Sequence, residues 1–87
     1  MISRDPDAAH SASSGHRYQI MRSELCGCFY CLEQFPPTAI EEWCDEDSTG
    51  EGQTALCPRC GIDSVIGSSS GFPITREFLE SMKRRWF

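Results

Sequence analysis

The 87-residue sequence lacks an apolar run long enough to cross a membrane. Its longest apolar stretch, residues 25–32, spans eight residues including a glycine, whereas a transmembrane helix needs about 18. The first sixteen residues mix both charge signs and have no continuous apolar core, so they do not resemble a secretory signal peptide. We therefore expect a cytoplasmic protein that does not bind membranes.

The sequence also lacks the usual signatures of catalysis. It has no glycine-rich phosphate-binding loop and no Gly-x-Ser-x-Gly element. Both histidines, His10 and His16, fall in the polar N-terminal stretch, so Asp63 and Ser64 have no evident histidine partner for a triad. We interpret both histidines as bystanders and expect no enzymatic activity.

Basic residues are scarce in the middle of the chain. Residues 25–72 hold eight acidic side chains and one basic side chain, Arg59, and the whole chain has a formal net charge of −5. An acidic centre repels nucleic-acid phosphates, which argues against a large DNA-binding face. The same charge suits a basic protein partner, so we expect a protein partner and disfavour nucleic acid.

Cysteine, in contrast, is abundant, with six residues in this short chain. Reducing compartments keep thiols free, so clustered cysteines favour a metal over disulfides, which a secreted chain would form instead. Cys28 and Cys31 form one Cys-x-x-Cys pair, and Cys57 and Cys60 form a second. Twenty-five residues lie between the two pairs. Four thiolates from two such pairs complete a structural zinc site. We predict one structural zinc ion, without which the domain unfolds.

Iron is the competing metal, because Cys-x-x-Cys…Cys-Pro-x-Cys-Gly also resembles the iron-binding knuckles of rubredoxins. Those proteins carry a glycine after both pairs, whereas Leu32 follows the first pair here, which favours zinc. A thiol redox protein is a further alternative, although no βαβ pattern surrounds either pair. We interpret Cys26 and Cys44 as small buried side chains. The other possibilities are a redox thiol or, for Cys26, a fifth or alternative metal ligand.

Residues 25–87 predict an α+β fold: a small zinc-ribbon-like antiparallel sheet with two cysteine knuckles, a short helix and a C-terminal amphipathic helix. Residues 53–56 and 62–66 are typical of short strands on either side of a tight turn. Thr38 and Glu41 fit a capping box, which predicts the short helix as far as Trp43. Thr75 is a good N-cap for the last helix. Its apolar stripe consists of Phe78, Leu79, Met82 and Trp86.

Residues 1–24 predict a disordered or weakly ordered N-terminal extension. Residues 1–16 contain almost nothing apolar, which is typical of a tail. Tyr18 and Ile20 lie two residues apart, which is a weak strand signal over residues 17–22.

Several short motifs occur between residues 28 and 87. They are Cys-Phe-Tyr-Cys at 28–31, Phe-Pro at 35–36, Glu-Trp at 42–43, Thr-Ala-Leu-Cys-Pro at 54–58, Cys-Gly-Ile-Asp-Ser-Val-Ile-Gly at 60–67, Pro-Ile-Thr at 73–75, Phe-Leu at 78–79 and Trp-Phe at 86–87. Together they resemble a group of small bacterial cytoplasmic proteins without an assigned activity. The resemblance covers about two thirds of the chain and implies a cytoplasmic, four-cysteine metal protein.

These observations predict a small non-enzymatic zinc-binding protein that acts as a protein-interaction module. Four protein thiolates leave no open position on the metal to activate water. A nucleic-acid-binding zinc ribbon is the alternative, supported by Arg59 and the basic residues 83–85. The predicted partner surface comprises Glu41, Glu42, Asp45, Glu46, Asp47 and Glu51, with exposed aromatic rings of the first knuckle at Phe29 and Tyr30.

Overall fold

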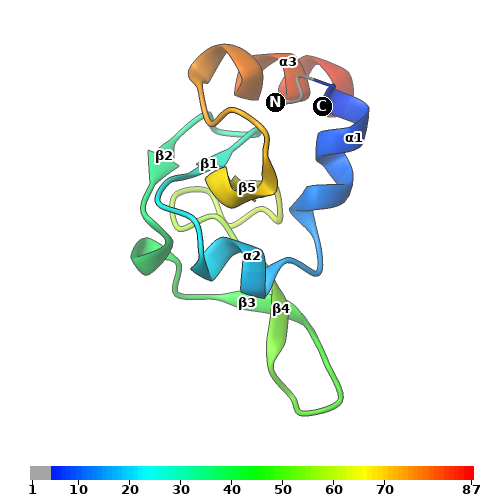
Figure 1. Ribbon diagram of the computed structural model, residues 1–87, viewed down its shortest axis with the longest axis vertical. Coiled ribbons are helices and arrows are strands. Elements are labelled where there is room, and N and C mark those ends of the chain that lie inside the picture. Colours follow the sequence, from blue (N-terminus) through cyan, green and yellow to red (C-terminus); the bar gives the residue numbers. More distant parts are fainter. Residues whose placement is uncertain (1–4) are drawn as a thin grey trace.

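A three-stranded antiparallel sheet with the order β2-β1-β5 lies at the centre of the computed structural model, which describes residues 5–87 (Figure 1). Its strands are β1 (Cys26–Cys28), β2 (Gln34–Phe35) and β5 (Val65–Gly67). The first cysteine pair begins at the end of β1, and the second lies in the connection that leads to β5. Because β1 pairs with β5, the sheet brings the two cysteine pairs together.

A two-stranded hairpin projects from the body, at the lower end of the view in Figure 1. It consists of β3 (Trp43–Glu46) and β4 (Gly52–Ala55). Asp47 organises its turn, since Oδ1 accepts hydrogen bonds from the Thr49 N–H at 2.9 Å and the Thr49 hydroxyl at 2.6 Å. These bonds lower the pKa of the Asp47 carboxyl below its usual value. The strand predicted at residues 53–56 corresponds to β4, whereas the one predicted at residues 62–66 overlaps β5 only at Val65 and Ile66. The two strands belong to different sheets.

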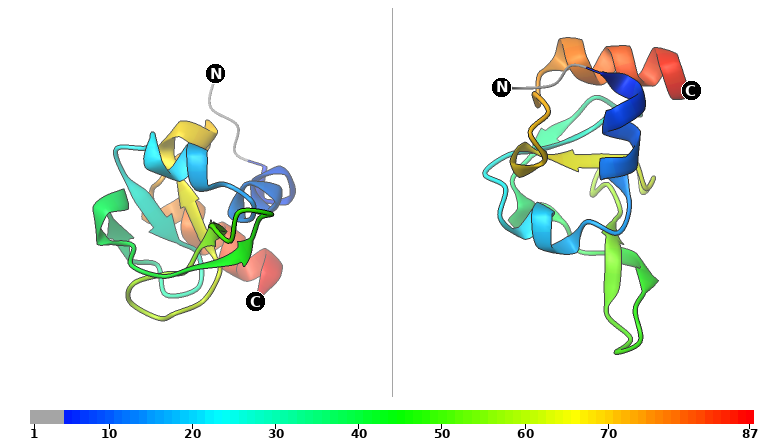
Figure 2. Two further views of the ribbon diagram at one scale, coloured as in Figure 1. Left: turned by 90° about the horizontal axis from the view of Figure 1, so that it is seen from below. Right: turned by 45° about the vertical axis from the view of Figure 1, so that its right-hand side comes forward.

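The predicted C-terminal helix is confirmed as α3 (Arg76–Trp86), which crosses the end of the molecule opposite the hairpin (Figure 2). Thr75 caps it, because its side chain accepts a hydrogen bond from the Phe78 N–H at 3.2 Å. Leu79 packs against β1, where a Cβ on Gly27 would lie 2.8 Å from the Leu79 Cδ1 atom. Trp86 departs from the predicted inward stripe, since 36% of it is exposed.

The N-terminal region differs from the prediction. Residues 17–22 do not form a strand; they contain the helix α2 (Arg17–Met21), which follows α1 (Pro6–His10) and a 3₁₀ turn at Ser11–Ser13. Ala9 and Ile20 are fully buried, so these few apolar side chains anchor the segment to the rest of the fold. Residues 1–4 of the predicted extension lie outside the described part of the chain.

The predicted helix ending near Trp43 is also wrong. The chain forms a single 3₁₀ turn at Pro37–Ala39 and becomes extended from Ile40, whose ψ is 121°. Trp43 then pairs with Ala55 across the hairpin. The capping-box pattern is local, and the backbone hydrogen bonds of this longer-range pairing outweigh it.

Two groups of buried side chains hold the fold together. One surrounds the cysteine pairs and includes Ile20, Phe35 and Val65. The other fills the space between the central sheet, α1 and α3, and includes Phe29 and Leu79. None of the helices within residues 5–87 combines the length and apolar character that a bilayer span requires.

Candidate metal centre

The first cysteine pair lies in a knuckle turn between β1 and β2. The Cys28 N–H donates to the Glu33 carbonyl at 3.0 Å, and the Leu32 N–H donates to the Cys28 carbonyl at 2.9 Å. The turn closes through Leu32, whose φ of 67° lies in the left-handed region. This conformation costs a residue with a Cβ about 1–2 kcal/mol.

The second pair repeats this backbone pattern. The Cys57 N–H donates to the Ile62 carbonyl at 3.0 Å, and the Gly61 N–H donates to the Cys57 carbonyl at 2.9 Å. Gly61 takes the left-handed position with a φ of 79°, which glycine adopts without strain. The two turns are therefore equivalent in hydrogen bonding, although only the second has glycine at the strained position.

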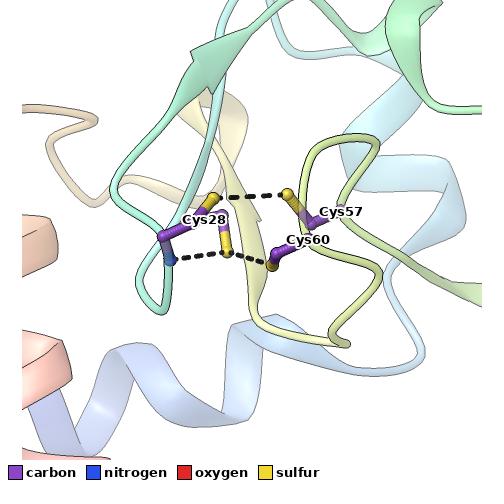
Figure 3. Close-up of side chains that lie close together, drawn as sticks. Cys28, Cys57 and Cys60 are labelled. Atoms are coloured by element: carbon purple, nitrogen blue, oxygen red, sulfur yellow. Dashed lines mark hydrogen bonds between the residues drawn. The ribbon is translucent and has the colours of Figure 1, made fainter.

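The two knuckles bring four sulfur atoms into one cluster, formed by Cys28, Cys31, Cys57 and Cys60, with all four ligand atoms within 4.8 Å of one another. Across the two pairs, the Cys28 and Cys60 sulfurs lie 3.6 Å apart (Figure 3). The Cys31 and Cys57 sulfurs lie at the same distance from each other. Sulfurs at the corners of a tetrahedron around zinc, with Zn–S bonds of about 2.3 Å, lie about 3.8 Å apart. The cluster thus has the size and donor set to hold one metal ion.

Hydrogen bonds to sulfur stabilise negative charge within the cluster. The N–H groups of Tyr30 and Cys31 point at the Cys28 Sγ from 3.4 and 3.5 Å, and the Arg59 N–H points at the Cys57 Sγ from 3.3 Å. These donors leave sulfur lone pairs available for a metal while they compensate the burial of charge.

Burial and charge act differently on the individual thiols. Burial raises the pKa of Cys28, but hydrogen bonds from the Ser64 hydroxyl and the backbone of the knuckle outweigh it and hold the pKa below its usual value. Burial, together with the nearby Cys28 charge, raises the pKa of Cys31, and it raises the pKa of Cys60 to about 11. A cation bound among the sulfurs would supply the positive charge that four neighbouring thiolates require.

The two remaining cysteines lie outside the cluster. Cys26 is fully buried in β1, as predicted for a small core side chain, and burial raises its pKa to about 11. Cys44, also predicted to be a buried side chain, is only half-buried, because it lies in β3 of the projecting hairpin. All six cysteines fall within residues 5–87, and none of them forms a disulfide there.

The residues of the predicted partner surface differ in exposure. Tyr30 is 38% exposed, and the Lys83 Nζ lies 5.1 Å from the centre of its ring. Phe29 is only 2% exposed and packs in the core beneath α3, so its prediction as an exposed ring is wrong. The carboxylates of Glu41, Glu42, Asp45, Glu46, Asp47 and Glu51 are all exposed.

His16 is a structural residue that the sequence pattern did not indicate. Only 5% of it is exposed; Nδ1 lies 2.6 Å from the Ala12 carbonyl, and Nε2 accepts a hydrogen bond from the Ala55 N–H at 3.0 Å. The backbone N–H of His16 donates to the Gln53 carbonyl at 2.7 Å. His16 therefore covers the outer edge of β4, a role that a single histidine in a polar stretch does not signal.

No protein-family model matches the chain, and neither a curated protein nor a solved structure matches it. The resemblance to small bacterial cytoplasmic proteins therefore stays a prediction.

Proposed function

We propose that this protein is a small zinc protein in which a single ion, bound by Cys28, Cys31, Cys57 and Cys60, holds the fold together. The observation that carries the proposal is the cluster of four sulfurs from two knuckles with matching backbone hydrogen bonds. An all-thiolate, tetrahedral donor set is typical of structural zinc. With all four positions filled by protein, the metal has no site for a reacting water, which supports a non-enzymatic role.

Iron is the competing occupant, because tetrahedral thiolate sites also suit iron. Metal analysis and an absorption spectrum of the purified protein distinguish the two. We expect a colourless protein with one zinc ion per chain. A red protein with stoichiometric iron would contradict the zinc assignment and favour electron transfer.

Zinc in this position is proposed to supply much of the folding free energy. Metal binding to structural sites contributes roughly 10–16 kcal/mol in small zinc domains, whereas a domain of this size has little stability to spare. Chelation should therefore collapse the dispersed amide NMR spectrum, and readdition of zinc should restore it. Six free thiols and the resemblance to bacterial cytoplasmic proteins support the cytoplasm as the compartment.

We further propose that the protein acts by binding a basic protein partner through the acidic side of the β3–β4 hairpin. The hairpin projects from the body (Figure 1). Glu51 forms an ion pair with Arg17 at 3.4 Å, whereas none of the ion pairs among residues 5–87 involves Glu42 or Glu46. Two other hairpin carboxylates maintain the hairpin itself, since Asp45 accepts a hydrogen bond from the Thr54 hydroxyl at 2.7 Å and Asp47 organises the turn. Glu42 and Glu46 are the exposed carboxylates best suited to a partner.

Charge reversal tests this surface. Glu42→Lys with Glu46→Lys should abolish a salt-sensitive complex with a protein from the host, because like charges then face the partner. The matched control reverses Glu24 and Glu77, which are exposed on other elements, and should retain the complex. A complex that survives reversal at the hairpin would refute this surface. Retardation of nucleic acid at low salt would instead favour the nucleic-acid-binding alternative.

A further inference from the structure

Ser64 lies directly before β5, next to the metal centre. It is 1% exposed, and its Oγ lies 3.0 Å from the Cys28 Sγ. Among the side-chain oxygens of residues 5–87, this hydroxyl is the one within hydrogen-bonding distance of a cluster sulfur. Most side-chain hydrogen bonds in proteins go to backbone groups or water, so a buried serine hydroxyl bonded to a sulfur is unusual.

The backbone fixes Ser64 in this place independently of its hydroxyl. The Ser64 carbonyl accepts a hydrogen bond from the Phe29 N–H at 3.0 Å, and the next residue, Val65, pairs with Cys28 across the sheet. These two contacts attach the segment that leads into β5 to the first knuckle. Loss of the side-chain hydroxyl alone leaves both backbone contacts in place.

The direction of the hydrogen bond follows from the charge on sulfur. A cysteine that binds a metal is a thiolate and has no proton to donate, so the serine hydroxyl must donate to Cys28. Cys28 then has a side-chain donor in addition to the N–H groups of Tyr30 and Cys31. Cys57, its counterpart in the second knuckle, has only the Arg59 N–H among the described donors to its sulfur.

Ser64 also lines an open space. It lines a cavity of about 310 Å³, together with His10, Ser13 and Asp63 and the rings of Phe29, Trp86 and Phe87. Cys28 itself is not among the residues that line this cavity.

We propose that Ser64 is a positioning residue of the metal centre: its hydroxyl donates to the Cys28 thiolate, fixes the orientation of that sulfur and slows loss of the metal. This inference rests on the proposed zinc site. Hydrogen-bonding partners of metal ligands typically change metal affinity by 10–100-fold.

Ser64→Ala tests the proposal, with Ser13→Ala as the matched control. Ser13 is also buried and lines the same cavity, but its hydroxyl donates to the His10 carbonyl at 2.6 Å rather than to sulfur. In Ser64→Ala we expect Zn²⁺ affinity to fall about tenfold, with faster transfer of zinc to a chromophoric chelator. With Co²⁺ in the site, the thiolate-to-metal charge-transfer band should move to longer wavelength, since an unbonded thiolate gives up electron density more easily.

Ser64→Thr keeps the hydroxyl and should restore both the affinity and the band position. A Ser64→Ala protein with the affinity, release rate and cobalt spectrum of Ser13→Ala would overturn the proposal. Should Ser64→Ala fail to fold, the wild-type protein loaded with ¹¹³Cd²⁺ decides: a slowly exchanging Ser64 hydroxyl proton coupled to cadmium supports the bond, and its absence refutes it. Wild-type protein that takes up none of these metals would refute the metal site itself, which is a distinct outcome.

Discussion

Replacement of His16 by alanine removes the side chain that fastens the N-terminal segment to the hairpin. In the folded protein the His16 ring joins the Ala12 carbonyl to the Ala55 N–H, with distances of 2.6 and 3.0 Å. Ala55 is fully buried, so water cannot easily replace the lost acceptor. We therefore expect His16→Ala to lower the free energy of unfolding.

The two hydrogen bonds of the His16 ring determine how much the free energy of unfolding falls. A buried N–H left without a partner costs about 1–3 kcal/mol, and the second hydrogen bond contributes about 1 kcal/mol. The expected loss in the free energy of unfolding is therefore about 2–4 kcal/mol. In a chain of this length, such a loss lowers the thermal unfolding midpoint by roughly 10 °C or more.

We also expect the stability of the fold to depend on pH through His16. Burial lowers the pKa of His16 below its usual 6.5, although the bond to the Ala12 carbonyl works against this shift. A histidine with a lowered folded-state pKa contributes stability that is complete above pH 6.5 and is lost as the pH falls through the folded-state pKa. Below pH 6.5, wild-type stability should decline more steeply than that of His16→Ala.

Thermal denaturation of the metal-loaded proteins between pH 7.5 and pH 5.5 measures both effects. His10→Ala is the control for the loss of a histidine side chain, because His10 is exposed. Metal content measured at each pH separates histidine titration from metal loss. A His16→Ala protein as stable as wild type, or one with an unchanged pH slope, would show that the N-terminal segment does not depend on this contact.

Further substitutions test the knuckles, the remaining cysteines and the hairpin turn. Gly61→Ala should weaken Co²⁺ binding about tenfold in a spectrophotometric titration, because a residue with a Cβ at φ 79° carries about 1–2 kcal/mol of backbone strain. The added Cβ meets no atom within 4 Å, so the strain is the only expected cost. Wild-type affinity would contradict this. Cys26→Ser and Cys44→Ser should both keep one metal per chain by mass spectrometry, whereas only Cys26→Ser should melt markedly earlier, since it places a hydroxyl in the core. Asp47→Ala should accelerate amide hydrogen exchange at Thr49 without changing the metal content, because the Asp47 carboxylate holds that amide; unchanged exchange would mean that the turn forms without it.

The features predicted correctly from the sequence are those that local spacing encodes. The two cysteine pairs define their knuckles because each turn is closed by neighbours within five residues. The helix α3 follows from Thr75 and the spacing of Phe78, Leu79 and Met82, all of which the fold buries. These elements do not depend on knowledge of distant partners.

The features that were missed depend on contacts between distant parts of the chain. Residues 5–24 look like a tail because their apolar content is small, yet Ala9 and Ile20 are fully buried by partners that follow much later in the sequence. The backbone around Trp43 is extended because Trp43 pairs with Ala55 across the hairpin, although the local capping pattern favours a helix. Phe29 is buried because α3 returns to cover the first knuckle, which no pattern near Phe29 reveals.

Native mass spectrometry of the untreated protein tests the metal centre most directly. We expect a folded chain carrying a single zinc ion. A chelator should remove that ion once any one of the four cluster residues is replaced by serine; these residues are Cys28, Cys31, Cys57 and Cys60. Folded, metal-free protein, or a full complement of zinc after two of these replacements are combined, would contradict this expectation.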